Sequence, residues 1–536
     1  MSLSHMLDGL NESQKQAVMA DEGHVLIVAG PGTGKTLTIA CRIAYLVNQG
    51  VNPENILAVT FTNRAAREMK ERANAFLGSK ADNAFIGTFH LLGLKIVRQS
   101  MQDDFVICNR DEQRNILKEI LKGTKTKAQE AAERISRIKN FLEDADKGMS
   151  DIYKAYQSAL SNKSALDFDD LILKPIEMFD DSSLLNKYRK RFMHIIVDEY
   201  QDINCAQYIL LKLLAGNDAN VCVVGDSDQA IYAFRGADIE NFLNFEKDFT
   251  DAQRINLTEN YRSTGTILNA SDSMIKNNLK RIDKKLLPAK DLGSPINMVS
   301  VPDEKAEGEF IVKEIEARIG CTSHYKLYAG GFRKDVVPTA DSYSFSDFAV
   351  IFRTNAQAKA IEEVFMESGI PYQVIGRKNL RQRKEIEDTI SYMKSIINPS
   401  YEAGREQSTS LEETLLMEDD LFDPKANAVT LMTLHMAKGL EFNVVFIAGA
   451  EDGLVPYTLN KDNIDIEEER RLFYVGMTRA KDELFLIHAR NRFLYGQRLN
   501  QSPSPFLKEI PKELMKSTTI PDRPRKAKKE QQAGLF

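Results

Sequence analysis

The stretch AGPGTGKT, residues 29–36, follows the apolar run HVLIV (24–28) and precedes the apolar-periodic run TLTIACRIAYLV (36–47). The flanking runs predict a strand before this stretch and a helix after it. In that setting the pattern predicts a phosphate-binding loop, in which glycines let backbone N–H groups approach phosphate oxygens at a helix N-terminus. Its members are Gly30, Pro31, Gly32, Thr33, Gly34, Lys35 and Thr36.

Lys35 and Thr36 carry the chemistry expected of this loop. Lys35 would contact the β- and γ-phosphates of a nucleotide, and the Thr36 hydroxyl would ligate Mg²⁺. The same eight residues could instead form a glycine-rich turn that leads into a core helix. The strand before them and the helix after them favour the nucleotide interpretation.

The composition is typical of a globular protein. The 536 residues suggest roughly three or four domain-sized units, and no apolar run reaches the length of about 20 residues that spans a bilayer. The N-terminus lacks the pattern of a secretory signal. Five scattered cysteines without metal-type spacing predict reduced thiols and a cytoplasmic location. A net charge of −6 argues against a histone-like protein but is compatible with a nucleic-acid enzyme that has local basic patches.

Acidic and amide side chains follow two further runs that predict buried strands. The run HIIV (194–197) ends in Asp198 and Glu199, and NVCVVG (220–225) is followed by Gln229. Ligands bind at the carboxyl ends of strands in open parallel sheets. We therefore expect Asp198 to hold Mg²⁺ directly or through water, and Glu199 to orient and deprotonate the attacking water. Gln229 would sense the γ-phosphate or the attacking water. A plain helix cap is the alternative for the acidic pair, and the upstream phosphate loop disfavours it.

Four residues outside these runs suit other parts of a nucleotide. The Gln14 amide offers a donor and an acceptor to the edge of adenine. Tyr261 could stack on adenine, and the adjacent Arg262 could contact the γ-phosphate. Arg479 belongs to a second α/β unit and is expected to act as an arginine finger. The expected strands of that unit are 296–301, 348–352, 429–434, 444–449 and 483–488.

Aromatic side chains beyond expected strand ends indicate a surface for single-stranded nucleic acid. Phe61 follows one strand, and Tyr232, Phe234 and Arg235 follow another. Aromatic rings stack on bases, and an arginine adds a cation next to the rings. For Phe61 the alternative is packing in the core.

The order of nine motifs resembles that of the UvrD/Rep/PcrA family of superfamily 1 DNA helicases, over nearly the whole chain. The motifs are LNESQ, AGPGTGKT, TFTNRAA, GTFH, VDEYQD, VVGDSDQAIYAFRGA, LTENYRS, TLHMAKGLEF and YVGMTRAK. The resemblance implies an α/β fold of two RecA-like P-loop domains with parallel sheets. It also implies ATP and Mg²⁺ between the domains, single-stranded and tailed duplex DNA as substrates, and 3′-to-5′ translocation.

The resemblance also implies roles for individual residues. It places Glu441 on the ribose, and it assigns Gln14, the phosphate loop, Asp198, Glu199, Gln229, Tyr261, Arg262 and Arg479 the nucleotide roles described above. The residues at positions that contact DNA in the family are Phe61, Asn63, Thr88, His90, Tyr232, Phe234, Arg235 and His435.

The chain departs from the family pattern in three places. Phe234 stands where the family usually has tryptophan, and Leu37 replaces the arginine usual after GKT. A phenylalanine stacks with less area, so the grip on DNA would be weaker. The large insert of the second domain is nearly missing, which puts autonomous duplex unwinding in doubt. Conversely, residues 321–347 resemble an added loop to which no role is assigned.

The motif positions predict the domain boundaries. The first RecA-like domain is expected at 1–84 and 191–258 with a helical insert at 85–190, the second at 259–380 and 424–510, a much reduced insert at 381–423, and a disordered tail at 511–536.

The tail ends in QAGLF (532–536), which resembles the Q-x-x-L-F peptides that bind bacterial sliding clamps. Gln532, Leu535 and Phe536 would make that contact, and a tail without function is the alternative.

The leading hypothesis is an ATP-dependent 3′-to-5′ single-stranded DNA translocase and helicase, used in DNA repair or replication. One alternative is a translocase that strips proteins from DNA or needs a partner to unwind a duplex. A nucleotide-gated DNA-binding scaffold with little turnover is a second alternative, and the presence of Glu199 and Arg479 argues against it. The length of the chain, its second α/β unit and Arg479 also argue against a phosphate-loop kinase or signalling switch.

Overall fold

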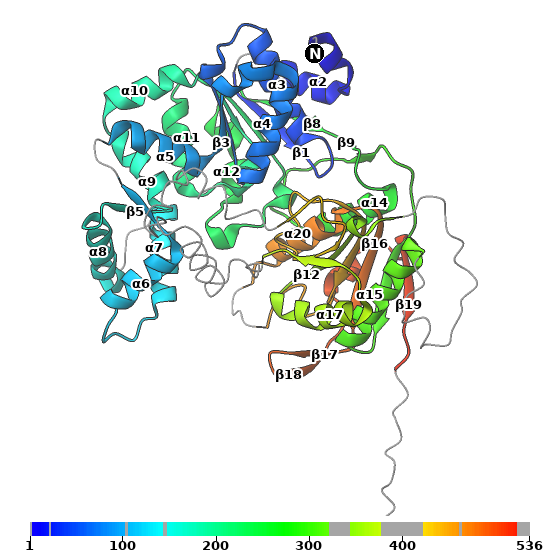
Figure 1. Ribbon diagram of the computed structural model, residues 1–536. Helices are drawn as coiled ribbons and strands as arrows, with labels where there is room; N and C mark the ends of the chain where they lie inside the picture. The colour runs from blue at the N-terminus through cyan, green and yellow to red at the C-terminus, as the bar shows by residue number, and fades with distance from the viewer. Residues whose placement is uncertain are drawn as a thin grey trace, which may run out of the picture. The chain divides into compact units, whose positions relative to one another are not determined.

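The structure, a computed structural model, describes residues 3–20, 23–101, 105–142, 147–320, 343–376, 422–459 and 464–522. These residues form two compact units, each built on a parallel sheet (Figure 1). Unit 1 contains residues 3–262 and 278–289, and unit 2 contains 263–277, 290–376 and 422–522. The described part of the chain has no helix of the length and apolarity needed to cross a bilayer.

The sheet of unit 1 has six parallel strands in the order β3-β2-β6-β7-β1-β8. Its interior strands are buried runs of apolar residues, because helices cover both faces. The strands are β1 (Val25–Ala29), β2 (Ile56–Thr60), β3 (Phe85–Thr88), β6 (His194–Val197), β7 (Asn220–Gly225) and β8 (Gln253–Leu257). The strand expected before the phosphate loop is β1.

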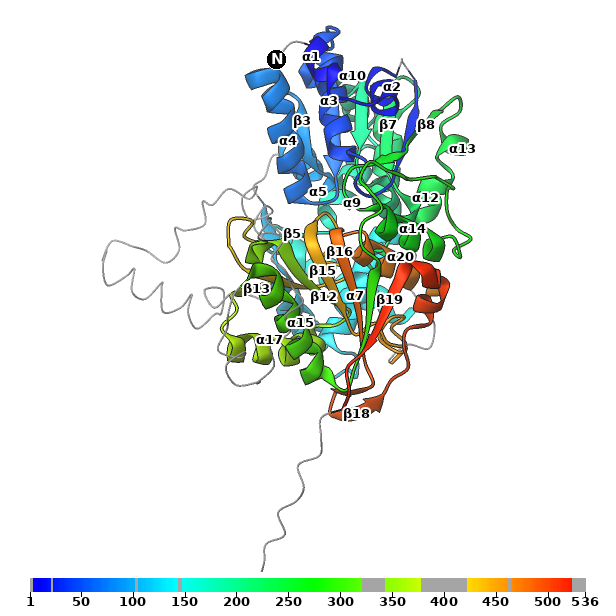
Figure 2. The ribbon, with the colours of Figure 1, turned by 90° about the vertical axis from the view of Figure 1, so that its right-hand side faces the viewer.

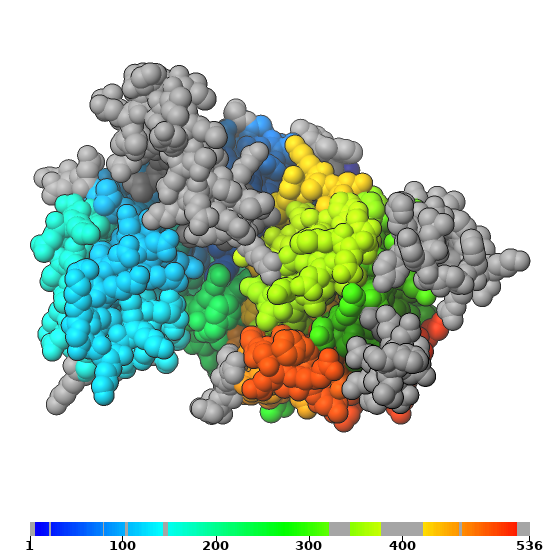
Figure 3. All heavy atoms as spheres, turned by 60° about the horizontal axis from the view of Figure 1, so that its bottom comes forward, coloured from blue at the N-terminus to red at the C-terminus, as the bar shows by residue number. Residues whose placement is uncertain are grey.

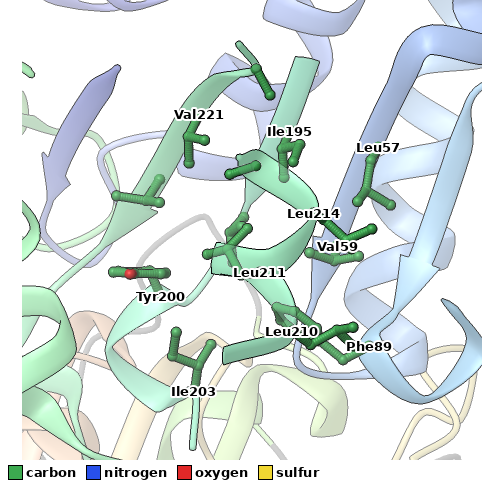
Figure 4. Close-up of a cluster of buried hydrophobic side chains, with 14 of the residues drawn as sticks. Leu57, Val59, Phe89, Ile195, Tyr200, Ile203, Leu210, Leu211, Leu214 and Val221 are labelled. Carbon is green, nitrogen blue, oxygen red and sulfur yellow. The ribbon is translucent and has the colours of Figure 1, made fainter. Parts of the chain in front are cut away.

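Helices pack on both faces of this sheet. Alternate strand residues point to opposite faces, so Leu57 and Val59 join one core cluster while Ile56 and Ala58 join another. Figure 4 shows the first cluster, where Leu210, Leu211 and Leu214 of α11 meet the strands. The helices around the sheet are α1 (Leu3–Asp8), α2 (Glu12–Met19), α3 (Lys35–Asn48), α4 (Asn63–Leu77), α5 (Phe89–Ser100), α9 (Asp170–Met178), α10 (Ser182–Arg191), α11 (Cys205–Ala215), α12 (Ile239–Leu243) and α13 (Phe245–Asp248).

A helical insert with its own small core lies between α5 and α9. Leu117, Ile135 and Tyr156 are buried in that core, and its surface appears in cyan in Figure 3. The insert consists of β4 (Val106–Cys108), α6 (Arg110–Ile120), α7 (Ala128–Phe141), α8 (Lys147–Ser161) and β5 (Ala165–Asp167). The expected start of the insert at residue 85 is wrong, because β3 pairs with β2 in the main sheet.

The sheet of unit 2 has seven parallel strands in the order β13-β14-β12-β15-β16-β11-β19. Helices α15 and α17 cover one face, where their apolar residues join those of the strands (Figure 2). The strands are β11 (Ile296–Val301), β12 (Phe348–Phe352), β13 (Tyr372–Val374), β14 (Val429–Thr433), β15 (Phe442–Ala448), β16 (Ala480–Ala489) and β19 (Met515–Thr519). The helices are α14 (Gly265–Ile275), α15 (Glu304–Ile319), α17 (Asn355–Ser368) and α20 (Ile466–Met477).

Two short ribbons complete the described strands. In unit 2, β17 (Asn491–Leu494) and β18 (Gln497–Asn500) form an antiparallel hairpin. In unit 1, β10 (Leu287–Pro288) pairs in parallel with β9 (Glu259–Asn260). Residues 278–289, expected in the second domain, therefore belong to unit 1.

The end of the chain differs from the expected disordered tail. Strand β19 pairs with β11 through residues 515–519, so the prediction of disorder is wrong there. The expected insert remnant up to residue 421, the clamp peptide at 532–536 and the added loop up to residue 342 lie outside the described residues.

Candidate nucleotide and DNA sites

The loop between β1 and α3 has the backbone geometry that close approach to a phosphate requires. Gly32 and Gly34 have φ angles of +69° and +82°, in the left-handed region that favours glycine. A Cβ added at Gly32 would lie 2.6 Å from Cβ of Arg262, so the loop and this arginine are tightly packed. Lys35 and Thr36 open α3, where backbone N–H groups lack acceptors within the helix. The loop thus presents backbone donors, an ammonium and a hydroxyl together.

Gln14, the adenine candidate, is buried against this loop. Its Nε2 donates to the carbonyl of Thr33 at 3.0 Å, and its Oε1 accepts from the backbone N–H of Asn11 at 3.1 Å. An amide nitrogen carries two hydrogens and an amide oxygen two lone pairs. Gln14 therefore keeps one donor and one acceptor position while it braces the loop.

Tyr261, the other adenine candidate, is held by its backbone and its hydroxyl. Its N–H donates to the carbonyl of Gly32 at 2.9 Å. The hydroxyl donates to Oε2 of Glu259 at 2.7 Å and accepts from Nδ2 of Asn11 at 2.8 Å. The side chain is 46% exposed, which leaves ring surface for stacking.

Asn260 is a supporting residue that the sequence did not reveal. It is fully buried, and its Nδ2 donates to the carbonyl of Pro31 at 2.6 Å. Its Oδ1 accepts from the backbone N–H of Arg262 at 2.9 Å. Asn260 thus joins the phosphate loop to the predicted γ-phosphate arginine across 229 residues of sequence.

The acidic pair after β6 lies at the phosphate loop. Nζ of Lys35 lies 3.0 Å from Oε1 of Glu199. Asp198 is buried, with Oδ2 3.4 Å from the Thr60 hydroxyl and Oδ1 accepting from the N–H of Glu199 at 2.9 Å. Glu199 has a φ of +51°, a strained conformation for a residue other than glycine that is typical of functional sites. This geometry fits the predicted base and Mg²⁺ ligand, whose roles stay predictions.

Gln201 connects the acidic pair to Gln229. It is completely buried, and its Nε2 donates to Oε2 of Glu199 at 2.5 Å. Its Oε1 accepts from the backbone N–H of Asp226 at 3.0 Å. Oδ2 of Asp226 in turn accepts from Nε2 of Gln229 at 2.7 Å. Gln201 and Asp226 belong to the motifs VDEYQD and VVGDSDQAIYAFRGA, but no local pattern in the sequence marks either as functional.

The remaining nucleotide candidates belong to unit 2. Arg479 is buried, with Nε donating to the carbonyl of Val475 at 2.9 Å. Glu441 is exposed and pairs with Lys481 at 2.9 Å. His435, the DNA candidate of this unit, lies just beyond β14 and is half-buried. The structure brings the other nucleotide candidates together within unit 1.

The predicted aromatic platform is formed in unit 1. The rings of Phe61 and Tyr232 are stacked, with centroids 4.8 Å apart and planes 17° apart. Phe234 lies beside Tyr232 at 6.0 Å and is 61% exposed. The Arg235 guanidinium lies 5.4 Å from the Tyr232 centroid, within cation–π range. Phe61 is only partly buried, so its side chain is not simply a core residue.

A second aromatic pair follows the neighbouring strand. Thr60 and Thr88 are register partners in β2 and β3, and the Thr88 hydroxyl caps α5 by accepting from Leu91 N–H. The His90 ring stacks on Phe168 at 4.0 Å, and burial lowers the pKa of His90 to about 4. His90 is therefore uncharged at neutral pH. Asn63 begins α4, next to this edge.

Comparison with known proteins gives matches over most of the chain. The model of the UvrD/REP helicase N-terminal domain matches residues 10–250. The model of the UvrD-like helicase C-terminal domain matches residues 255–412 and 406–491.

Curated relatives are similar in sequence along most of their own length. They include the ATP-dependent DNA helicase PcrA of Staphylococcus aureus (strain Mu50), 34% identical over 662 aligned positions that cover 96% of this chain and 88% of the relative. The PcrA of Staphylococcus epidermidis (strain RP62A) is 35% identical over 664 positions with the same coverage. The alignment has 662 positions and this chain has 536 residues, so at least 126 positions contain a residue of the relative opposite a gap in this chain.

One solved structure, the C-terminal domain of a possible DNA helicase from Lactobacillus plantarum WCFS1, matches 48% of this chain and 98% of its own. Its TM-score is 0.26 at 18% identity, too low to support an argument.

Proposed function

The chain belongs to the UvrD/REP helicase family, and on that premise we propose that it hydrolyses ATP to move along single-stranded DNA and unwind duplexes. The observation that carries this proposal is the hydrogen-bonded connection from Lys35 through Glu199 and Gln201 to Gln229, in the unit that also bears the aromatic platform. The 3′-to-5′ polarity, a role in DNA repair or replication and a cytoplasmic location belong to the proposal as well.

The residues present fit ATP with Mg²⁺. A Cβ at Gly34 would lie 2.7 Å from Nε2 of Gln14, so the loop keeps its backbone bare for phosphate oxygens. Lys35 would neutralise the β- and γ-phosphates. The Thr36 hydroxyl and the Asp198 carboxylate supply the oxygen ligands that Mg²⁺ prefers. Mg²⁺ held there would neutralise phosphate charge during transfer to water.

Several side chains would act on the γ-phosphate and the attacking water. Glu199 would orient the water and take its proton. Gln201 holds that carboxylate through Oε2, while Lys35 lies at Oε1. Gln229, Arg262 and Arg479 would contact the γ-phosphate and stabilise the charge that develops on its oxygens.

The aromatic platform would hold DNA bases. Phe61, Tyr232 and Phe234 offer three ring faces at one sheet edge, and Arg235 adds a cation next to them. Asn63, Thr88, His90 and His435 would contribute polar contacts. The uncharged His90 would act as a stacking or hydrogen-bonding group and not as a phosphate-binding cation.

The second candidate function is a translocase that strips proteins from DNA or unwinds only with a partner. It is favoured by the reduced insert expected at 381–423 and by the number of aligned positions that the relatives fill and this chain lacks. A sliding clamp contact through Gln532, Leu535 and Phe536 stays a prediction from the sequence.

The test is ATPase activity with and without single-stranded DNA, for the wild type and Glu199→Gln. DNA should stimulate wild-type turnover. Glu199→Gln keeps the shape of the side chain but removes the base, so kcat should fall about 10²- to 10⁴-fold while ATP and DNA still bind. Wild-type turnover that DNA does not change would contradict the proposal, and near-normal turnover of the variant would remove Glu199 as the base.

A further inference from the structure

The segment 278–289, which we call the strap, belongs to unit 1, although the chain on both sides of it belongs to unit 2. It touches three elements of the candidate nucleotide site. Its β10 pairs with the segment that contains Asn260, and the N–H of Ile282 donates to the Ser227 hydroxyl at 3.0 Å. The Leu286 side chain would lie 2.8 Å from a Cβ added at Gly30. The strap therefore packs on the phosphate loop, the Asp226–Gln229 turn and the Asn260 segment together.

Lys284 is the charged centre of the strap. Its ammonium pairs with the carboxylates of Asp226 and Asp228, and its side chain is only 3% exposed. Arg281 binds Asp228 of the same cluster, with Nε and Nη2 donating at 3.0 and 2.8 Å. Burial alone would raise the pKa of Asp228, but the two cations outweigh it and hold that pKa below its ordinary value. Asp228 is therefore ionised between the two cations.

The contacts of Asp226 link this cluster to Gln229. Its Oδ1 faces Lys284 and accepts from the N–H of Asp228 at 3.0 Å, while its Oδ2 accepts from Nε2 of Gln229 at 2.7 Å. Asp226 is completely buried, so bulk solvent does not reach the carboxylate to compensate for a lost cation. Without Lys284 the carboxylate would lose the cation that faces its Oδ1 and could turn, so the Gln229 amide would lose its fixed direction.

We propose that Lys284 is a positioning residue for ATP hydrolysis, which fixes the Asp226 carboxylate so that Asp226 aims the Gln229 amide at the γ-phosphate. The inference rests on the proposed function of Gln229. The strap is continuous with unit 2 at both ends, so it is also a covalent connection from that unit to the glutamine.

The experiment is a double-mutant cycle in the full-length protein, with DNA-stimulated kcat and KM for ATP as readouts. Lys284→Met should lower kcat about tenfold with little change in KM, because a group that acts on the transition state has lost its support. Gln229→Ala should lower kcat by at least as much. The double variant Lys284→Met/Gln229→Ala should equal Gln229→Ala alone, since both changes remove one interaction.

The matched control is Arg281→Met. It also removes a buried strap cation from Asp228, but it leaves Lys284 on Asp226. We expect a similar loss of thermal stability and a nearly wild-type kcat. A purely structural role for the strap would instead make the two methionine variants equally slow.

Three results would overturn the inference while Gln229→Ala is impaired. The first is a wild-type kcat in Lys284→Met, and the second is an equal loss of kcat in Lys284→Met and Arg281→Met. The third is a loss of kcat in the double variant that equals the product of the two single-variant losses. If Lys284→Met does not fold, Asp226→Asn tests the same link with Lys284 still paired to Asp228, and a wild-type kcat there overturns it. A wild-type kcat in Gln229→Ala would instead refute the proposed function of Gln229 itself.

Discussion

Replacing Gln201 by leucine should separate two roles of its side chain: support of the Glu199 carboxylate, the predicted catalytic base, and simple packing. Leucine has a similar volume, so it fills the space while it removes both hydrogen-bonding groups. The buried N–H of Asp226 would lose its acceptor, and Oε2 of Glu199 would lose a donor. A buried group left unsatisfied costs about 1–3 kcal/mol, and a hydrogen bond to a charged group contributes about 1.5–3 kcal/mol. Together the two losses should lower the free energy of unfolding by about 2.5–6 kcal/mol.

Turnover should fall in the same variant, because Glu199 keeps its ion pair with Lys35 but loses the contact on its other oxygen. Misplacement of a reacting group by about 1 Å costs up to about 100-fold in rate, so we expect kcat to fall about 10- to 100-fold. The assays are urea unfolding and DNA-stimulated ATP hydrolysis, at a temperature where the variant is folded.

The control for this prediction is Gln207→Leu. Gln207 is also buried, and its Oε1 accepts from the N–H of Asn204 in the capping box of α11. Its loss should cost about 1 kcal/mol of stability and leave kcat unchanged. A wild-type kcat in Gln201→Leu, or an equal fall in kcat in the control, would refute the reasoning.

Three further predictions concern other parts of the molecule. Gly34→Ala would place a side chain on a residue with a φ of +82° and bring its Cβ within 2.7 Å of Gln14. The affinity for a fluorescent ATP analogue should therefore fall at least about tenfold, and an unchanged affinity would contradict the loop geometry. Phe234→Trp enlarges an exposed ring, so anisotropy with labelled single-stranded DNA should show about two- to fivefold tighter binding, and equal binding would count against stacking there. Burial raises the pKa of Glu307 from 4.5 to about 7; the neighbouring Glu451 carboxylate also raises it, and Arg492 lowers it by a smaller amount than burial raises it. Between pH 7 and 4.5 the folded state then binds a proton that the unfolded chain does not hold, so the free energy of unfolding should rise as the pH falls through this range. Urea unfolding should show a steeper rise for the wild type than for Glu307→Gln. Parallel pH profiles of the two proteins would show that Glu307 does not titrate in this range.

The loop at 29–36 and the sheet edge at which ligands are expected were predictable from the sequence because their signals are local. The eight residues 29–36, with their glycines between an apolar strand and a helix, are enough to predict the loop. The alternation of apolar runs with polar ends places Asp198, Glu199 and Gln229 at the same sheet edge. The structure confirms the two parallel α/β units that follow from these signals.

The supporting residues were not predictable because their partners are distant in the sequence. Asn260 reaches Pro31 across 229 residues, and Lys284 reaches Asp226 across 58. The neighbouring residues in the sequence do not distinguish such a buried amide or ammonium group from an exposed one. Only the folded backbone shows that their hydrogen-bonding partners are already in place.

Strand β19 shows a different limit. Its sequence, MKSTT, has no alternating apolar pattern, and its residues are mostly exposed. It is ordered by backbone pairing with β11 at the edge of the sheet, a source of stability that leaves little trace in side-chain composition. The prediction of disorder from residue 511 therefore extended too far.

The central claim, directional movement along DNA driven by ATP, is tested most directly by streptavidin displacement. Oligonucleotides carry biotin at the 5′ or the 3′ end, and release of bound streptavidin is followed with and without ATP. This assay needs no duplex, so the reduced insert expected at 381–423 does not affect its outcome. We predict ATP-dependent release from the 5′ end, little release from the 3′ end, and none with Glu199→Gln. The absence of ATP-dependent release from either end, or release from the 3′ end alone, would contradict the account.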